Sequence, residues 1–553
     1  MNRLYYGDNL DVLRGCIDNE SVDLIYLDPP FNSQATYNVL FKSTAGEKSR
    51  AQIGAFEDTW HWGDEAELAF DGVISSGNSD AAEMLRAMRS FLRENDMMAY
   101  LSMMTVRLLE LHRVLKPSGS IYLHCDPTAS HYLRILIDAV FGATNFRNEL
   151  IWKRTSAHSA ADRWGDIHDT VFYYSKSDEY TWNELLLPHT DEYSARYKNV
   201  DKDGELWADD NLTAPGVRHG DSGAIWRGYD PTAKGVHWKV NLKTVERLVG
   251  AAKAKELSTT RKLDLLDEHG HIHWPKARGG HGEGFPRFKR YLSEGTVVQD
   301  VITDVPPLNS QAQERLGYPT QKPLALLERI ITVSSNEGDV VLDPFCGCGT
   351  TIHAAQKLRR EWIGIDITHL AISLIEKRLK DAFPGIKYEV HGTPKDVDGA
   401  RDLAARDKYQ FQWWAVSLVN AVPFAGKKKG ADSGIDGLIY FKPEGRVTEK
   451  AIVSVKGGEN VNVAMVRDLA HVVDREGAKI GVFLTLADST GPMRTEAVKA
   501  GYYETLYGKY PKIQILTIRE LFEGKQPNIP LVDASTFKKA PKESQGEQGP
   551  LPF

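Results

Sequence analysis

The sequence predicts an α/β protein whose main domain contains a doubly wound sheet and whose C-terminal part forms a second α/β domain. Strand-length apolar runs at 22–27, 120–125 and 340–342 alternate with helical patterns, as in sheets that carry helices on both faces. Two of these runs end in an aspartate followed by proline, at Asp28 and Asp343. Apolar patterning resumes after the polar stretch 391–408, which predicts a linker between two domains.

Length and composition agree with a multidomain globular protein. The chain has 553 residues, 42% of them hydrophobic and 26% charged, so it can bury a large core without disulfides. Its four cysteines form no Cys-x-x-Cys pair, which argues against a zinc site or a secreted disulfide framework and favours the cytoplasm. No long apolar span occurs, so no membrane partner is expected. Because the net charge is -7, any nucleic-acid contact has to come from local basic faces.

The elements follow in order along the first 175 residues. Residues 3–6 predict a strand before a Gly7-Asp8 turn, with Asn9 as the candidate helix cap. The polar segment 46–95 is an insertion without an assigned role. His124, near the end of a strand, is expected to be a hydrogen-bonded wall of the pocket. The other predicted elements are a helix from Tyr100 to 115, a strand at 120–126, a helix at 131–141 and strands at 149–153 and 170–174.

The strand at 340–342 runs into a tight glycine loop, Asp343-Pro344-Phe345-Cys346-Gly347-Cys348-Gly349. Glycines in such a loop bring bare backbone close to a ligand. A second short strand at 362–365 ends in Asp366, whose carboxylate can accept hydrogen bonds from a ribose. Together they predict a nucleotide-type cofactor site. This loop alone also fits a dinucleotide-dependent dehydrogenase, although the full Gly-x-Gly-x-x-Gly fingerprint is absent.

The strand at 22–27 ends in Asp28-Pro29-Pro30-Phe31, in which every residue has a chemical use. The exocyclic amino group of a base is a poor nucleophile because its lone pair is delocalised into the ring. Asp28 and the Pro29 carbonyl can accept its two N–H bonds and hold the nitrogen towards tetrahedral geometry. Prolines stiffen the segment, and Phe31 offers a stacking face worth roughly 1–3 kcal/mol.

These two motifs resemble those of the S-adenosylmethionine-dependent DNA amino-methyltransferases. The order, with the catalytic motif first and the cofactor loop last, resembles the permuted β group over residues 1 to 390. The resemblance implies a Rossmann-like methyltransferase sheet and adenine N6 as the target, because the family's aspartate form usually goes with adenine. It also implies catalytic roles for Asp28, Pro29, Pro30 and Phe31. Cofactor contacts are implied for Asp8, Thr320, Gln321, Lys322, Asp343, Pro344, Phe345, Gly347, Gly349, Thr350 and Asp366, with Asp8 alternatively only supporting its turn.

Residues 176–317 change character, with basic and aromatic residues interspersed, as in Lys276–His281 and Arg287–Tyr291. Basic residues neutralise phosphates while planar groups meet bases. In the β group this interval is the target-recognition region, which implies double-stranded DNA as partner and makes Arg287, Lys289 and Arg290 candidate DNA-binding residues. A solvated insertion with ordinary surface charge is the alternative. Residues 318–390 then form the cofactor-binding half.

Residues 409–530 resemble restriction-endonuclease-like domains of the Mrr type, in which an aspartate and a Glu/Gln-x-Lys strand hold a metal and a water. Asp436 and Lys456 match that pattern, whereas Ser454 stands where the acid or amide is expected. Asp436 is therefore the candidate metal ligand for Mg²⁺. Either the domain cleaves DNA, or it is a degenerate nuclease fold that only binds DNA. Residues 531–553 are expected to be a disordered tail.

The sequence as a whole predicts a site-specific adenine-N6 DNA methyltransferase of the prokaryotic cytoplasm or nucleoid. A cytosine-N4 methyltransferase and a bifunctional restriction-modification enzyme are the alternatives. Small-molecule or RNA methylation and a non-enzymatic DNA-binding module are competing classes. A homodimer and a separate restriction subunit both remain open as partners. Cytosine-C5 chemistry would need a Pro-Cys nucleophile, and the sequence contains no such pair.

Overall fold

The computed structural model describes residues 2–30, 36–42, 48–57, 61–155, 164–275, 285–292, 295–309, 312, 314–316, 318, 320–424, 434–443, 447–506 and 508–530. The chain divides into two compact units, Met1–Asn183 with Gln299–Leu551, and Glu184–Val298. Within the described part, no helix is both long and apolar enough to cross a membrane.

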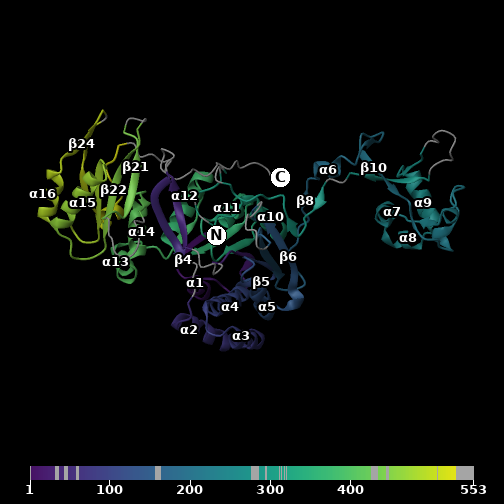
Figure 1. Ribbon diagram of the computed structural model, residues 1–553, viewed down its shortest axis with the longest axis horizontal. Coiled ribbons are helices and arrows are strands. Elements are labelled where there is room, and N and C mark those ends of the chain that lie inside the picture. The colour runs from purple at the N-terminus through teal and green to yellow at the C-terminus, as the bar shows by residue number, and fades with distance from the viewer. Residues whose placement is uncertain are drawn as a thin grey trace. The chain divides into compact units, whose positions relative to one another are not determined.

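A nine-stranded sheet forms the centre of the first unit (Figure 1). Among its described pairings, only those of β7 are antiparallel. Parallel sheets need helical crossovers, which explains the alternation in the sequence. In spatial order the strands are β16 (Val301–Ile302), β6 (Phe146–Lys153), β7 (His168–Ser175), β5 (Leu115–Cys125), β2 (Val22–Leu27), β17 (Val340–Asp343), β18 (Glu361–Asp366), β1 (Arg3–Tyr6) and β19 (Glu389–His391).

Both faces of this sheet are covered by helices. Successive side chains along a strand point to opposite faces, so each buried strand contributes to two hydrophobic cores. Ile25 and Leu27 of β2 join one core cluster, and Leu24 and Tyr26 join the other. The first cluster contains α1 (Asn9–Cys16), α2 (Asp64–Ile74), α3 (Ser79–Leu92), α4 (Asp96–Val114) and α5 (Ser130–Phe141). The second contains α10 (Leu324–Ser334), α11 (Thr350–Lys357) and α12 (His369–Ala382). This arrangement confirms the predicted doubly wound fold.

The insertion at 46–95 contributes helices to the first core rather than forming a separate body. Ala69, Phe70 and Val73 of α2 and Leu85 of α3 are buried there. Before them, β3 (Thr36–Lys42) pairs with β4 (Lys48–Glu57) in an antiparallel hairpin. Phe31, the candidate stacking residue, lies outside the described residues.

The C-terminal domain contains a five-stranded mixed sheet with helices on both faces (Figure 1). Its strands are, in spatial order, β20 (Val422–Pro423), β21 (Gly437–Phe441), β22 (Glu449–Lys456), β23 (Ile480–Thr485) and β26 (Ile513–Thr517). Strands β22, β23 and β26 are parallel, whereas β21 is antiparallel to its neighbours. The other elements are α14 (Lys408–Leu418), α15 (Val463–Arg475), α16 (Gly491–Lys499), β24 (Tyr502–Thr505), β25 (Gly508–Pro511) and α17 (Ile518–Phe522).

The linker expected at 391–408 is largely a helix, α13 (Val397–Arg406). Ala400, Leu403 and Ala404 recur at helical spacing and are buried in the core of the C-terminal domain. Asp396 caps the helix by accepting from the Gly399 amide at 2.7 Å. The expectation was wrong here because low overall apolarity concealed a short amphipathic stripe and a good N-cap.

The second unit, Glu184–Val298, covers fewer residues than the expected recognition region 176–317. Strand β16, which falls within that expected region, belongs to the nine-stranded sheet instead. Its four-stranded antiparallel sheet has the order β13-β14-β10-β9, and its core is rich in aromatic rings, among them Trp226, Trp238 and Phe288. The elements are β8 (Leu186–Leu187), α6 (Asp191–Ser194), β9 (Asn199–Val200), β10 (Leu206–Asn211), β11 (Thr213–Pro215), β12 (Val236–Trp238), α7 (Leu242–Val249), α8 (Ala251–Glu256), α9 (Thr259–Glu268), β13 (Ile272–His273), β14 (Arg287–Tyr291) and β15 (Thr296–Val297).

Candidate active site

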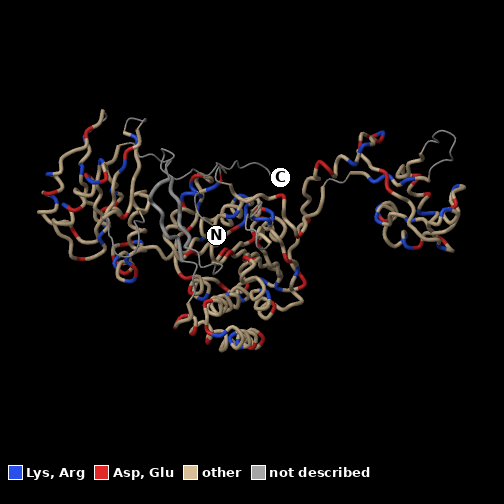
Figure 2. The backbone as a smooth tube through the Cα atoms, viewed as in Figure 1, with Lys and Arg blue, Asp and Glu red and all other residues tan. Residues whose placement is uncertain are grey.

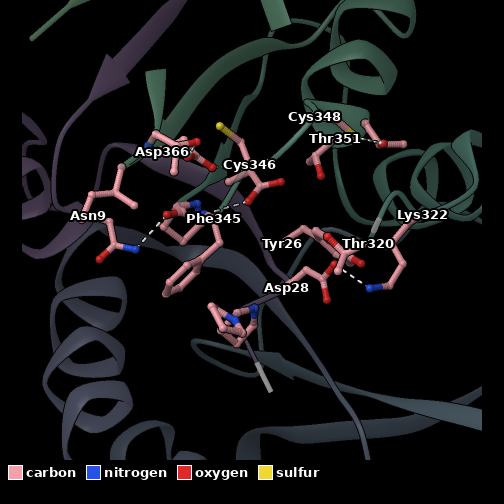
Figure 3. A pocket seen from close by; sticks show the side chains of 18 of the residues that line it. Asn9, Tyr26, Asp28, Thr320, Lys322, Phe345, Cys346, Cys348, Thr351 and Asp366 are labelled. Carbon is pink, nitrogen blue, oxygen red and sulfur yellow. Dashed lines mark hydrogen bonds and ion pairs between the residues drawn. The ribbon is translucent and has the colours of Figure 1, made fainter. Parts of the chain in front are cut away.

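A pocket opens where β1, β2, β17 and β18 end, with a cavity volume of about 270 Å³ (Figure 3). The carboxyl ends of parallel strands are where open α/β sheets bind ligands. All the described residues predicted for catalysis or cofactor binding line this pocket, with the exception of Gly349. Their individual roles remain predictions. The lining also includes residues for which the sequence predicted no catalytic or cofactor role, namely Gly7, Asn9, Tyr26, Arg107, Tyr318, Leu327, Cys346, Cys348, Thr351, Ile367 and Thr368.

The glycine loop joins β17 to α11. Its glycines were expected to bring bare backbone close to a ligand, but their backbone conformation and their protein neighbours also require glycine. Gly347 and Gly349 have φ angles of 48° and 73°, in the left-handed region that favours glycine. A Cβ on Gly349 would lie 2.7 Å from Cγ1 of Ile375, and one on Gly347 would lie 3.2 Å from Cε1 of Tyr318. The space beside Gly349 is therefore filled by protein, and its glycine serves backbone conformation and helix packing.

Asp366 ends β18 and ties the glycine loop to the start of α12. Its carboxylate accepts from the Gly347 amide at 2.9 Å and from both the amide and the hydroxyl of Thr368 at 2.8 Å. Burial raises its pKa to about 6 despite these hydrogen bonds. A carboxylate has about four lone-pair positions, so Asp366 retains acceptor capacity towards the pocket.

Asp343, at the end of β17, is the most strongly perturbed carboxyl group of the pocket. Burial raises its pKa to about 7, and the nearby charges of Asp28 and Asp366 act in the same direction. Hydrogen bonds from the Phe345 amide, at 3.0 Å, and from Thr351 oppose this shift. Ionisation of Asp343 is therefore disfavoured, and a cationic ligand beside it would stabilise the charged form.

Asp8 supports the turn after β1 and also faces the pocket. It is the N-cap of α1, accepting from the Leu10 amide at 2.8 Å, so the expectation that Asn9 caps this helix was wrong. Asn9 instead donates to the Pro344 carbonyl at 2.8 Å and accepts from Arg107 at 2.6 Å. Arg107 also forms an ion pair with Asp8 at 2.9 Å.

Arg107 is the most informative residue that sequence reasoning missed. It lies within the apolar helix α4, and its side chain is 5% exposed. Burial lowers its pKa, although the charge of Asp8 and the hydrogen bond to it oppose that effect. The sequence did contain a signal for this role, since Arg107 interrupts an apolar helical run. A buried charge requires a partner, so such an arginine predicts an ion pair.

Asp28 follows β2, and its carboxylate contacts the ammonium group of Lys322 at 2.5 Å (Figure 3). Their side chains are 15% and 11% exposed, respectively. Lys322 belongs to the loop before α10, in which the Gln321 side chain accepts from the Leu316 amide at 2.8 Å and donates to the Glu314 carbonyl at 2.7 Å. Gln321 thus stabilises its own loop, in addition to lining the pocket.

A buried hydrogen-bond chain lies behind Asp28. The Tyr26 hydroxyl is 2.8 Å from Nδ1 of His124, whose Nε2 is 3.1 Å from the Asp169 carboxylate. Because an ionised carboxylate can only accept, the Nε2–H group of His124 donates to Asp169. Arg154 forms an ion pair with Asp169 at 3.1 Å. His124 is fully buried and hydrogen-bonded, but it is not among the residues that line the pocket, so the expectation that it forms a wall of the pocket was wrong.

Three cations of β14, Arg287, Lys289 and Arg290, were the candidate DNA contacts and are here called the β14 cations. Each has a carboxylate neighbour: Asp209 at 3.4 Å, Asp201 at 3.3 Å and Asp210 at 3.7 Å, respectively. Figure 2 shows basic and acidic residues interleaved along this unit. Their DNA-binding role stays a prediction. Phe288 between them is buried in the unit's core, so the expectation that this ring meets bases was wrong, and Lys276–His281 lies outside the described residues.

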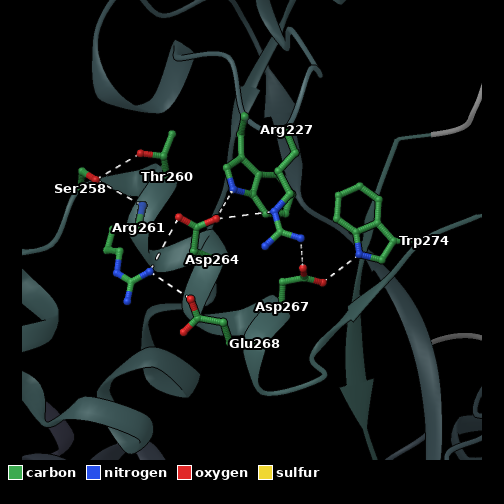
Figure 4. Close-up of polar contacts among 9 residues, drawn as sticks. Arg227, Ser258, Thr260, Arg261, Asp264, Asp267, Glu268 and Trp274 are labelled. Atoms are coloured by element: carbon green, nitrogen blue, oxygen red, sulfur yellow. Dashed lines mark hydrogen bonds and ion pairs between the residues drawn. The ribbon is translucent and has the colours of Figure 1, made fainter.

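A second polar cluster of this unit surrounds the turn at Arg227, whose φ is 46° (Figure 4). Arg227 forms ion pairs with Asp267 and Asp264 and lies over the rings of Trp226 and Trp274. Both indole N–H groups donate to the same carboxylates, at 2.9 Å and 2.8 Å. The cluster cross-links the turn to α9 and stabilises the unit's fold.

The candidate nuclease residues come together at the β21–β22 pair. Asp436 precedes β21 and accepts from the Val455 amide at 2.6 Å, while Ser454 and Lys456 lie on β22. Ser454 is buried. Within the described residues, no group of three or more His, Cys, Asp or Glu side chains forms a metal site. Asp432, four positions before Asp436 in the sequence, lies outside them.

Comparison with known proteins agrees with this architecture. Residues 22–377 match the DNA methylase family (N6_N4_Mtase), and residues 407–522 match a restriction endonuclease family (Mrr_cat). The type II methyltransferase M.EcaI of Enterobacter cloacae is 31% identical over 383 residues, 68% of this chain and 69% of that protein. The StyLTI Mod subunit, from a type III restriction-modification enzyme of Salmonella typhimurium, is 27% identical over 373 residues, 65% of this chain and 50% of that protein.

Likeness to solved structures is weaker. The cytosine-N4-specific PvuII DNA methyltransferase is 13% identical, with a TM-score of 0.30, over 70% of this chain and 89% of that one. That likeness is too low to carry an argument about function. The family match alone spans well over half of the chain. The chain therefore belongs to the N6/N4 DNA methylase family and carries a C-terminal domain of the Mrr restriction-endonuclease type.

Proposed function

We propose that the chain transfers a methyl group from S-adenosylmethionine to the N6 amino group of adenine in double-stranded DNA. One observation carries the proposal: the Asp28-Pro29-Pro30 segment and the glycine loop line the same pocket, at the ends of neighbouring strands β2 and β17. An acceptor for an amino group and a candidate cofactor loop therefore lie within reach of each other. The dehydrogenase alternative would leave Asp28-Pro29-Pro30 without a use.

The residues of the pocket fit this cofactor. S-adenosylmethionine, when bound, supplies an electrophilic methyl group on a positively charged sulfur. The pocket offers carboxyl groups at Asp8, Asp28, Asp343 and Asp366, and burial raises the pKa of Asp343 to about 7 and that of Asp366 to about 6. Because Asp8 and Asp28 already pair with Arg107 and Lys322, a bound cation would chiefly stabilise the ionised forms of Asp343 and Asp366. With three hydrogen bonds already accepted, Asp366 keeps about one acceptor position, which suits a ribose hydroxyl.

The target base would be rotated out of the duplex, as expected for enzymes that modify a base atom inside the stack. Asp28 and the Pro29 carbonyl then accept the two N–H bonds of the amino group. This orients the nitrogen lone pair towards the methyl donor, so one in-line displacement suffices. From the sequence, Phe31 is expected to stack on the extruded ring.

No covalent enzyme intermediate is needed in this reaction. After transfer the amine is cationic, so its proton leaves readily to water without a strong base. The cysteines that line the pocket, Cys346 and Cys348, are buried, and burial raises the pKa of both thiols. A protonated thiol is a poor nucleophile, which argues against a cysteine mechanism at this site.

Adenine N6 and cytosine N4 present the same amino group next to a ring nitrogen, so cytosine-N4 methylation is the second candidate. The aspartate of the Asp28 motif supports adenine by its resemblance to the family pattern. Methylation-sensitive sequencing of DNA from cells that express the protein reports both the modified base and its sequence context. Parallel assays on DNA, RNA and small molecules distinguish the substrate classes.

The decisive variant is Asp28→Ala. We expect methyl transfer to DNA to fall below detection, while S-adenosylmethionine affinity in calorimetry stays nearly unchanged, since Asp28 acts on the base. Asp18→Ala, which removes an exposed carboxylate of the same domain, is the matched control and should retain activity. Full transfer by Asp28→Ala would contradict the catalytic assignment.

The C-terminal domain leaves two functions to distinguish, DNA cleavage and DNA contact. Its match to a restriction endonuclease family supports a restriction-modification role for the chain. Ser454 in place of an acid or amide supports the binding alternative. The Mod-subunit relative is a reason to test for a separate restriction subunit, and size measurement in solution tests for a homodimer.

A further inference from the structure

The catalytic carboxylate of the pocket is paired with a cation in this structure. The Lys322 ammonium lies 2.5 Å from Oδ2 of Asp28, and both side chains are largely buried. The two residues are 294 positions apart in sequence, so the fold brings them together. Under the proposed function, Asp28 has to accept a hydrogen bond from the target amino group, and the Lys322 ammonium lies against the same carboxylate.

The backbone around Lys322 is held from both sides. Gln321 is bonded through its side chain to the Leu316 amide and the Glu314 carbonyl, and the Glu314 carboxylate accepts from the Leu324 amide at 3.0 Å. Tyr318 is 4% exposed. Entry of a base therefore displaces the lysine side chain over a fixed backbone, and its ammonium group stays close to the pocket.

A second carboxylate favours keeping the ammonium near its present position. The pKa of Asp169 is lowered by its hydrogen bond with His124 and by the charges of His124, Lys322 and Arg154, although burial opposes the shift. The charge of Lys322 thus interacts with Asp169 as well as with Asp28. When a base takes over Asp28, the attraction of Asp169 opposes the departure of the cation.

An acceptor and a donor side by side match one edge of an amino-bearing base. With the amino group at Asp28, adenine presents the acceptor N1 beside it, and cytosine presents the acceptor N3. Guanine O6 and thymine O4 at the same place would set an oxygen acceptor against the carboxylate, which is repulsive. A site that hydrogen-bonds the correct edge rejects analogues that leave its polar groups unpaired.

We propose, as an extension that rests on the proposed function, that Lys322 reads the ring nitrogen next to the target amino group. It exchanges its contact with Asp28 for that nitrogen when the base enters. The resemblance implied a cofactor contact for Lys322, whereas its geometry assigns it to the base. Lys322 then determines specificity, and Asp28 is left to act on the amino group.

The test combines a lysine variant with altered target bases. Lys322→Met keeps the apolar stem and removes the donor, and 1-deazaadenine replaces N1 with C–H. With the target sequence in a synthetic duplex, we expect the unaltered protein to lose about tenfold or more in kcat/KM on the 1-deaza base. The kcat/KM of Lys322→Met should fall by a similar factor on adenine and should fall no further on 1-deazaadenine, because the variant and the analogue remove the same contact.

Controls separate the alternatives. The 7-deazaadenine duplex and the exposed-lysine variant Lys380→Met should show no such coupling, and S-adenosylmethionine affinity of Lys322→Met should be unchanged. A second variant, Lys322→Leu, which also lacks a hydrogen-bond donor, replaces Lys322→Met if the latter unfolds at a lower temperature. For a cytosine target, 3-deazacytosine takes the place of 1-deazaadenine.

The possible failures are distinguishable. Three outcomes would each overturn the role of Lys322 while leaving methyl transfer intact. The effects of Lys322→Met and of 1-deazaadenine could be additive, or Lys322→Met could be coupled to 7-deazaadenine instead. Lys322→Met could also weaken cofactor affinity without any coupling to the altered base. Absence of transfer to any unmodified DNA by the unaltered protein would instead refute the proposed function.

Discussion

Replacing Asp343 with asparagine should make the methylase domain more stable at high pH and leave it nearly unchanged at low pH. The side chain is 3% exposed, and burial raises its pKa from 3.8 to about 7. Asparagine has nearly the same shape and keeps an acceptor for the Phe345 amide, which lies 3.0 Å from Oδ1 of Asp343. The substitution therefore removes the ionisation and little else.

The sign follows from proton binding. A carboxyl group whose pKa is raised in the folded state binds more protons folded than unfolded, so stability falls as pH rises from about 4 to about 7. Three pKa units correspond to about 4 kcal/mol in total. Between pH 5 and pH 8 the loss is about 3 kcal/mol, and Asp343→Asn should avoid it.

Scanning calorimetry at pH 5 and pH 8, without cofactor or DNA, measures this difference. The transition that shifts upward when S-adenosylmethionine is added identifies the methylase domain. Relative to the unaltered protein, Asp343→Asn should gain roughly 5 °C at pH 8 and roughly 2 °C at pH 5. The control, Asp71→Asn, removes an exposed carboxyl of α2 and should change neither. Equal shifts of Asp343→Asn at both pH values would refute the reasoning.

The remaining predictions concern three other places. Asp366→Ala should weaken S-adenosylmethionine binding about tenfold or more, because it removes a charge-assisted acceptor; unchanged affinity in a calorimetric titration would remove Asp366 from the cofactor site. In the unaltered protein, the affinity for S-adenosylmethionine should rise between pH 5.5 and 7.5, as the carboxyl groups with pKa values of about 6 and 7 ionise. Neutralising the β14 cations should weaken DNA binding and reduce its salt slope by about 1 for every cation that contacts a phosphate, and an unaltered slope would mean that they face away from DNA. If the C-terminal domain is a nuclease, Mg²⁺ or Mn²⁺ should promote cleavage of unmethylated DNA, and Asp436→Ala and Lys456→Ala should each abolish this cleavage. If no cleavage occurs and deletion of residues 409–530 weakens DNA binding, the domain is a binding domain.

Much of the fold was readable from local pattern. The strands 22–27 and 340–342 and the helix 131–141 could be predicted because apolar periodicity and proline or glycine boundaries are properties of adjacent residues. Where pattern was weak, prediction failed: the helix Val397–Arg406 has only a narrow apolar stripe, and overall polarity suggested a linker instead.

The acids that end the strands, and the glycine loop that follows one of them, can be read from the sequence, since both features lie within a few residues. The partners that these acids meet depend on how the chain folds. Arg107 pairs with Asp8 across 99 positions, and Lys322 pairs with Asp28 across 294. Long-range pairs leave no local period in a sequence, because they arise when burial in a shared core brings distant charges together and each must then find an opposite charge.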